Sequence, residues 1–120
     1  VRDIYEQSKS PIVLIGEERL PQKLKRFERF HGRIMEWAQA QPINVQDAMA
    51  LNRHYAPEVT IEEDLLKLLV AEAKGSARRM VTNIDRIAKF SVDEGLATIS
   101  ASQWGSRPIH TGQAPKERAF

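Results

Sequence analysis

The sequence contains no cysteine, no long apolar run and little net charge, and each absence excludes something. Without cysteine the 120-residue chain forms neither disulfides nor thiolate metal sites, which fits a reducing compartment. No apolar run approaches the roughly 20 residues that cross a bilayer, so we expect no membrane partner. The N-terminus also lacks the ordered regions of a signal peptide. A net charge of +2 is too small to indicate a partner by itself.

Several kinds of chemistry are also missing. The three histidines, His31, His54 and His110, lie in separate segments without helical pairing, so no metal site is expected. Ser76 has no histidine near it in the sequence and is better explained as a helix cap than as a nucleophile. There is no glycine-rich loop ending in Lys-Ser or Lys-Thr to hold phosphates, and no apolar strand ending in an acidic pair to hold Mg²⁺. The chain alone is therefore not expected to hydrolyse ATP.

Two adjoining helical patterns organise what is present. Residues 60–63 have the form of a capping box beginning at Thr60. The apolar positions that follow on one helical face are Ile61, Leu65, Leu66, Leu69 and Ala73. Gly75 can take the left-handed conformation that ends a helix, and Ser76 can cap the next one. The stripe of this second helix comprises Ala77, Met80, Val81, Ile84, Ile87, Ala88 and Ser91.

The opposite face of the second helix is basic and carries Arg78, Arg79, Arg86 and Lys89. The first turn of a helix carries partial positive charge and favours anions, so arginine is the wrong sign for stabilising it. Two arginines beside free backbone amides therefore indicate a phosphate ligand. The alternative is a pair of solvated arginines on an ordinary surface helix, and the local pattern leaves both interpretations open.

The N-terminal third mixes helix and strand signals. Residues 1–8 resemble the last turns of a helix that ends before Pro11. Residues 12–15 form an unalternating apolar run, which predicts a strand buried on both faces of a parallel sheet. Because nothing else in the sequence resembles a partner strand, this run predicts a fragment of a larger α/β domain. A helix is expected over residues 21–30, and residues 33–37 are a candidate second strand.

Positive charge is concentrated around the predicted helix 21–30, where only Glu28 opposes Arg19, Lys23, Lys25, Arg26, Arg29 and Arg33. We predict that one set of side chains contacts DNA phosphates without reading bases. This set is Lys23, Lys25, Arg26 and Arg29, supported by Arg79, Arg86 and Lys89. The alternative is an inert solvated helix face.

The remaining segments complete a mainly α-helical prediction. Asn44 is a candidate N-cap for a helix ending near Tyr55. Residues 96–100 are predicted to form a strand or an extended arm, and the composition after Gly105 predicts a disordered tail. The predicted organisation is a remnant of an α/β core over residues 1–42, a small helical lid-type bundle over 43–95, and an extended arm with a flexible tail over 96–120.

In this order the motifs resemble the C-terminal half of an AAA+ ATPase. Residues 11–17 are similar to the strand that ends in the sensor-1 position, and residues 30–34 to the arginine-finger segment. Gly75-Ser76-Ala77-Arg78 is similar to the Gly-x-x-Arg sensor-2 motif of the helical lid, the most specific of the three. Residues 14–20 most resemble phage transposition ATPases of the phage Mu transposition protein B type. The likeness covers residues 1–95.

The resemblance implies roles for three residues. Arg33 would be an arginine finger acting in trans, Arg78 would contact nucleotide, and Glu17 would occupy the sensor-1 slot, where the family normally has a neutral polar residue. ATP and Mg²⁺ are implied as ligands of the full-length protein. Double-stranded DNA, further copies of the chain and a transposase are implied as partners, in the cytoplasm of a bacterial host.

The implied function is non-specific DNA binding by an ATP-dependent oligomer that assists phage DNA transposition through target DNA selection. Two other classes stay open. A small helical DNA-binding module would depend on the basic segment alone. A helical protein-interaction domain without nucleotide chemistry would instead use the apolar stripes as an interface. A steep loss of DNA affinity with salt distinguishes the first from the second.

Overall fold

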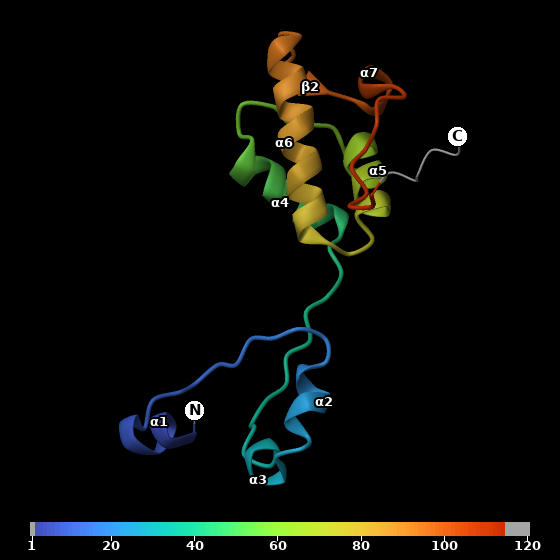
Figure 1. The fold of residues 1–120 in the computed structure, drawn as a ribbon. Helices are drawn as coiled ribbons and strands as arrows, with labels where there is room; N and C mark the ends of the chain where they lie inside the picture. Colours follow the sequence, from blue (N-terminus) through green and yellow to red (C-terminus); the bar gives the residue numbers. More distant parts are fainter. Residues whose placement is uncertain (1, 115–120) are drawn as a thin grey trace, which may run out of the picture. The chain divides into compact units, whose positions relative to one another are not determined.

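A computed structural model describes residues 2–114 and confirms a mainly helical chain (Figure 1). The chain divides between Gln39 and Ala40 into two compact units, called here the N-terminal and C-terminal units. The N-terminal unit contains α1 (Arg2–Ser8), α2 (Leu20–Leu24) and α3 (Glu28–His31). The C-terminal unit contains α4 (Val45–Tyr55), β1 (Thr60–Ile61), α5 (Glu63–Ala73), α6 (Ala77–Asp93), β2 (Thr98–Ile99) and α7 (Ala101–Trp104). None of the helices within residues 2–114 has the length and apolarity needed to cross a bilayer.

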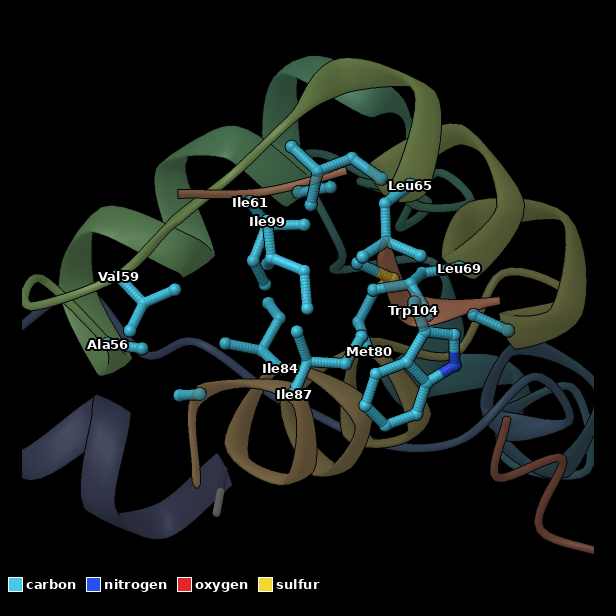
Figure 2. Close-up of a cluster of buried hydrophobic side chains, with 14 residues drawn as sticks. Ala56, Val59, Ile61, Leu65, Leu69, Met80, Ile84, Ile87, Ile99 and Trp104 are labelled. Atoms are coloured by element: carbon cyan, nitrogen blue, oxygen red, sulfur yellow. The ribbon is translucent and has the colours of Figure 1, made fainter. Parts of the chain in front are cut away.

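The C-terminal unit has a well-packed apolar core. Figure 2 shows side chains converging from α5, α6, the two strands and α7. The central members are almost fully buried: Leu65, Leu66, Leu69, Met80, Ile84, Ile87 and Ile99. Each such side chain contributes roughly 1.5–3 kcal/mol through burial. The predicted stripes of α5 and α6 therefore form this core, although Ala77 at the start of the α6 stripe is exposed.

A short parallel sheet joins β1 and β2, two segments of the unit that lie far apart in the sequence. Thr60 pairs with Thr98 and Ile61 with Ile99. The amide of Thr60 donates to the carbonyl of Ala97 over 2.9 Å, and the amide of Glu62 donates to the carbonyl of Ile99 over 2.8 Å. Of the two alternatives predicted for residues 96–100, a strand or an extended arm, the structure contains the strand, which is limited to Thr98–Ile99.

The capping box predicted at Thr60 is wrong. The N-cap of α5 is Glu62, and its side chain makes no capping hydrogen bond. Thr60 and Ile61 are instead extended, because their backbone groups belong to the ladder with β2. Ile61 still reaches the core, but it does so from a strand rather than from the helical face.

Asn52 on α4 forms hydrogen bonds with the edge of β1 that is not paired with β2. Its side-chain amide donates to the carbonyl of Val59 over 2.9 Å and to that of Ala56 over 3.3 Å, while its oxygen accepts from the amide of Ile61 over 2.9 Å. Asn52 is buried, so these backbone groups depend on it rather than on water. One side chain thus ties α4 to the strand.

We expect Asn52→Ala to destabilise the C-terminal unit by about 3 kcal/mol, because it leaves the Val59 carbonyl and the Ile61 amide buried without partners. Asn44→Ala is the matched control on the same helix. It removes the capping box that Asn44 forms with Asp47 at the exposed start of α4, and it should cost only about 1 kcal/mol. Urea unfolding followed by circular dichroism measures both. Equal losses would show that Asn52 is not essential to the strand edge.

The N-terminal unit has no buried side chain among those described. Residues 12–15, predicted to be a buried strand, form no strand. Val13 is 81% exposed and Ile15 93% exposed. A strand needs a neighbour to satisfy its backbone and cover its faces, and the described part of this unit provides none.

Two further predictions for this unit are wrong. The expected single helix 21–30 is interrupted after Leu24 and resumes at Glu28, giving α2 and α3. Its apolar face does not find a core, since Phe27 remains 65% exposed, and short helices depend on such packing. Residues 33–37 form no strand either. Trp37 lies against the ring of His31 with centroids 5.6 Å apart.

The expected disorder after Gly105 does not hold for residues 105–114. This segment returns along α6 and is hydrogen-bonded to it through Asn83. The composition suggested disorder, but the contacts with α6 depend on particular side chains and not on average polarity. Residues 115–120, which belong to the same predicted tail, lie outside the described residues.

Candidate nucleotide and DNA contacts

The corner between α5 and α6 is a tight, glycine-dependent turn. Helix α5 ends at Ala73, and both Lys74 (φ 49°) and Gly75 (φ 85°) are left-handed. The left-handed cap is therefore Lys74, one residue earlier than the predicted Gly75, which follows it and is also left-handed. A β-carbon on Gly75 would lie 3.4 Å from Pro42, in a backbone conformation that side chains disfavour. Position 75 therefore requires glycine.

Ser76 begins α6 as predicted. Its hydroxyl accepts a hydrogen bond from the amide of Arg79 over 3.3 Å. The first turn of this 17-residue helix contains no acidic residue. Arg78 lies in that turn with its side chain exposed, beside amides that have no intrahelical acceptor. Guanidinium, amides and helix dipole together favour an anion at this position.

The other cations of α6 have different surroundings. Arg79 is half-buried, whereas Arg86 and Lys89 are exposed. The Lys89 amine lies 4.0 Å from the carboxylate of Asp85, an exposed pair that contributes little to stability. Of these cations, only Arg78 combines a position in the first turn with an exposed side chain.

The basic cluster of the N-terminal unit is exposed and distributed over two short helices. Lys23 lies in α2, Lys25 caps it, Arg26 occupies the turn and Arg29 lies in α3. Within residues 2–114 none of the four forms an ion pair. Unpaired exposed cations at this density are suited to phosphate contacts that carry no sequence information.

Arg33 follows α3 and forms an ion pair. Its guanidinium donates to the carboxylate of Glu6 over 3.1 Å, with both side chains about half-exposed. Glu17 is exposed in the turn before α2, where its carbonyl accepts from the amide of Leu20. No group of three or more His, Asp or Glu side chains is arranged to hold a metal ion in the described part of the chain.

The candidate residues form two groups, one in each unit. Glu17, Arg33 and the basic cluster belong to the N-terminal unit. Arg78, Arg79, Arg86 and Lys89 all lie on α6 in the C-terminal unit. Comparison of the chain with protein-family models, with curated proteins and with solved structures found no match.

Sequence reasoning missed Asn52 and Asn83, the polar residues that organise the C-terminal unit. Both are buried, and their side chains bind backbone groups: Asn52 those of the nearby Val59 and Ile61, and Asn83 those of the distant His110. A signal was present, since Asn83 lies between Met80 and Ile84 on the apolar side of a strongly amphipathic helix. A polar residue in such a stripe indicates a specific buried partner.

Proposed function

We propose that this chain is the C-terminal part of an AAA+ ATPase that binds DNA non-specifically as an ATP-dependent oligomer and assists phage transposition by selecting target DNA. The observation that carries the proposal is the α5–α6 corner. Gly75 and Ser76 place Arg78, exposed, in the first turn of a long helix that has no acidic residue there. This is the arrangement expected of a sensor-2 arginine in a helical lid.

The exposed apolar run at residues 12–15 also supports the proposal. Its side chains gain nothing from exposure, and its backbone makes no ladder in the described structure. A parallel sheet from a part of the protein outside these 120 residues would bury the side chains and pair the backbone. In an AAA+ ATPase the sensor-1 strand occupies such a place, and residues 11–17 resemble it.

The described residues fit one part of a nucleotide site. Arg78 and the first-turn amides of α6 would hold an anionic phosphate, whereas the phosphate-binding loop and the Mg²⁺ ligands would come from outside this chain. ATP would supply the phosphate that is bound here, and hydrolysis of ATP would return the oligomer to its starting state. The chain's own contribution is to couple that phosphate to the orientation of the C-terminal unit. Hydrolysis by this chain alone is not proposed.

We expect Arg78→Ala in the full-length protein to weaken ATP affinity by about 10- to 100-fold, since hydrogen bonds to charged groups contribute about 1.5–3 kcal/mol. ATP-dependent assembly on DNA should weaken with it. Arg79→Ala is the matched control for ATP affinity, because it removes the same charge from the next position, which is half-buried. Nucleotide titration and sedimentation with DNA measure the two effects. Small, equal effects would make both arginines ordinary surface charges.

A second candidate is a small helical DNA-binding module without nucleotide chemistry. The exposed basic cluster, which lacks ion pairs within residues 2–114, favours it independently of the α5–α6 corner. The two proposals make different predictions for Arg78→Ala. If the chain is a DNA-binding module, Arg78→Ala should leave the affinity for ATP unchanged, or the wild-type protein should not bind ATP at all. DNA binding by the basic cluster should be retained in either case.

A further inference from the structure

After α7 the chain reverses direction and runs back along α6 (Figure 1). We call residues 105–114 the strap. Its first part is held beside α7, where the indole of Trp104 donates to the carbonyl of Arg107 over 3.1 Å. The Arg107 guanidinium donates back to the carbonyl of Trp104 over 2.9 Å and lies 4.2 Å from the ring centroid of Phe90. This start of the strap is therefore fixed on the second half of α6.

Asn83 fixes the middle of the strap by a two-point contact. Its side-chain amide donates to the carbonyl of His110 over 2.9 Å, and its oxygen accepts from the amide of His110 over 2.8 Å. Asn83 is only 2% exposed, so the strap is what satisfies its polar atoms. Because both atoms of one amide engage one residue, the contact sets the register of the strap on α6. We call this pair the latch.

One helical turn before Asn83, the strap lies against Arg79. Gly112 has φ +78°, and a β-carbon there would lie 2.6 Å from Nε of Arg79. Glycine is therefore what allows the strap backbone to approach the guanidinium so closely. Among the described residues the Arg79 side chain has no hydrogen-bond partner, so the strap covers its charge without neutralising it. Arg78, its neighbour, is exposed.

We propose that the strap is a removable cover that controls access to Arg79. With the latch closed, the first turn of α6 offers Arg78 alone to an anion. With the latch open, it offers both arginines. Opening would break the two hydrogen bonds of Asn83 and the packing of Ile109 against the core, and it would return a partly desolvated guanidinium to solvent. This inference does not depend on the proposed nucleotide role.

Arginine modification tests the cover without ATP or DNA. We would treat the full chain with phenylglyoxal, which reacts with accessible guanidinium groups, and measure the rates at Arg78 and Arg79 by mass spectrometry. In the wild-type chain Arg78 should react several-fold faster than Arg79. Asn83→Ala removes the latch and should bring the rate at Arg79 close to that at Arg78. The Arg78 rate in the same molecule is the internal reference.

Gly112→Ala provides a second route that leaves the core untouched. Its new methyl group would lie 2.6 Å from Nε of Arg79 at a strained positive φ, so the guanidinium, the strap or both must shift, which again should raise the rate at Arg79. Gly95→Ala is the matched control, since Gly95 also has a positive φ of 69° but has open space around it. It should leave the ratio of the two rates unchanged. The comparison separates backbone strain from the loss of the cover.

Two results would overturn the proposal. One is equal reactivity of Arg78 and Arg79 in the wild-type chain. The other is an unchanged ratio of rates in both Asn83→Ala and Gly112→Ala. Circular dichroism shows whether each variant retains its helices, and if Asn83→Ala unfolds, Gly112→Ala decides. Since the measurement uses neither nucleotide nor DNA, a failure of the cover is distinguishable from a failure of the proposed ATPase function.

Discussion

Arg33→Ala in the intact protein is expected to abolish DNA-stimulated ATP hydrolysis while leaving ATP binding nearly unchanged. If Arg33 is an arginine finger, it stabilises charge that develops only in the transition state, and its loss lowers the rate by about 10³- to 10⁵-fold. The substitution should not disturb folding, because Arg33 is exposed and its ion pair with Glu6 lies at the surface. Steady-state hydrolysis and equilibrium nucleotide binding measure the two quantities separately.

The controls for Arg33 test whether the planar shape of its side chain matters and whether it acts on the nucleotide of a neighbouring subunit. Arg33→Lys should restore little activity, because a lysine lacks the planar fork that engages a phosphate. Mixing Arg33→Ala with subunits whose own phosphate-binding loop is defective should recover some turnover if the finger acts between subunits. Arg53→Ala removes an exposed arginine from α4, outside the proposed sites, and should have no effect. Normal hydrolysis by Arg33→Ala would contradict the assignment, and Arg29 would become the candidate.

Replacing Lys23, Lys25, Arg26 and Arg29 together with glutamine is expected to weaken duplex DNA binding and to flatten its salt dependence. Each lost phosphate contact lowers the slope of log affinity against log salt by roughly 0.9, so the four together should lower it by roughly 3–4. The effect should be the same for unrelated DNA sequences, since phosphate contacts do not read bases. Fluorescence anisotropy at several salt concentrations measures the slope.

A matched control distinguishes local contacts from net charge. Arg53, Lys67 and Lys74 are exposed cations of the C-terminal unit, and replacing them with glutamine should change the slope far less per charge removed. If both sets lower the slope equally per charge, binding reflects the overall charge and the cluster has no special role. If the basic-cluster variant binds with unchanged slope, the cluster is an inert solvated surface.

Local sequence signals predicted α4, α6 and most of α5 because capping and helical periodicity act within a few residues. Asn44 caps α4 and Ser76 caps α6, each by accepting from the amide three residues later. The exposed position of Arg78 follows from the same local information. It requires only that α6 begins at Ser76 and that its apolar stripe faces the core.

The candidate site was predictable only in part, because local rules cannot say what covers a helix face. Arg78 and Arg79 are equivalent in the local pattern, yet one is exposed and the other is half-buried beside Gly112. The difference comes from the strap, whose polar composition suggested disorder. Particular contacts hold the strap against α6: the close approach of Gly112 to Arg79, the two hydrogen bonds of Asn83, and the position of Arg107 over Phe90.

The sequence by itself therefore determined α4, α6 and most of α5, the core residues that α5 and α6 contribute, and the basic surface of the N-terminal unit. Only the tertiary structure decided which extended segments become strands. The local sequence at Thr60 and Ile61 is compatible with a capping box, but in the structure these residues pair with Thr98 and Ile99, because that ladder satisfies backbone groups at the edge of the core. Residues 12–15, with the stronger strand signal, stay exposed. Strand formation depends on a partner edge, and that is a property of distant parts of the chain.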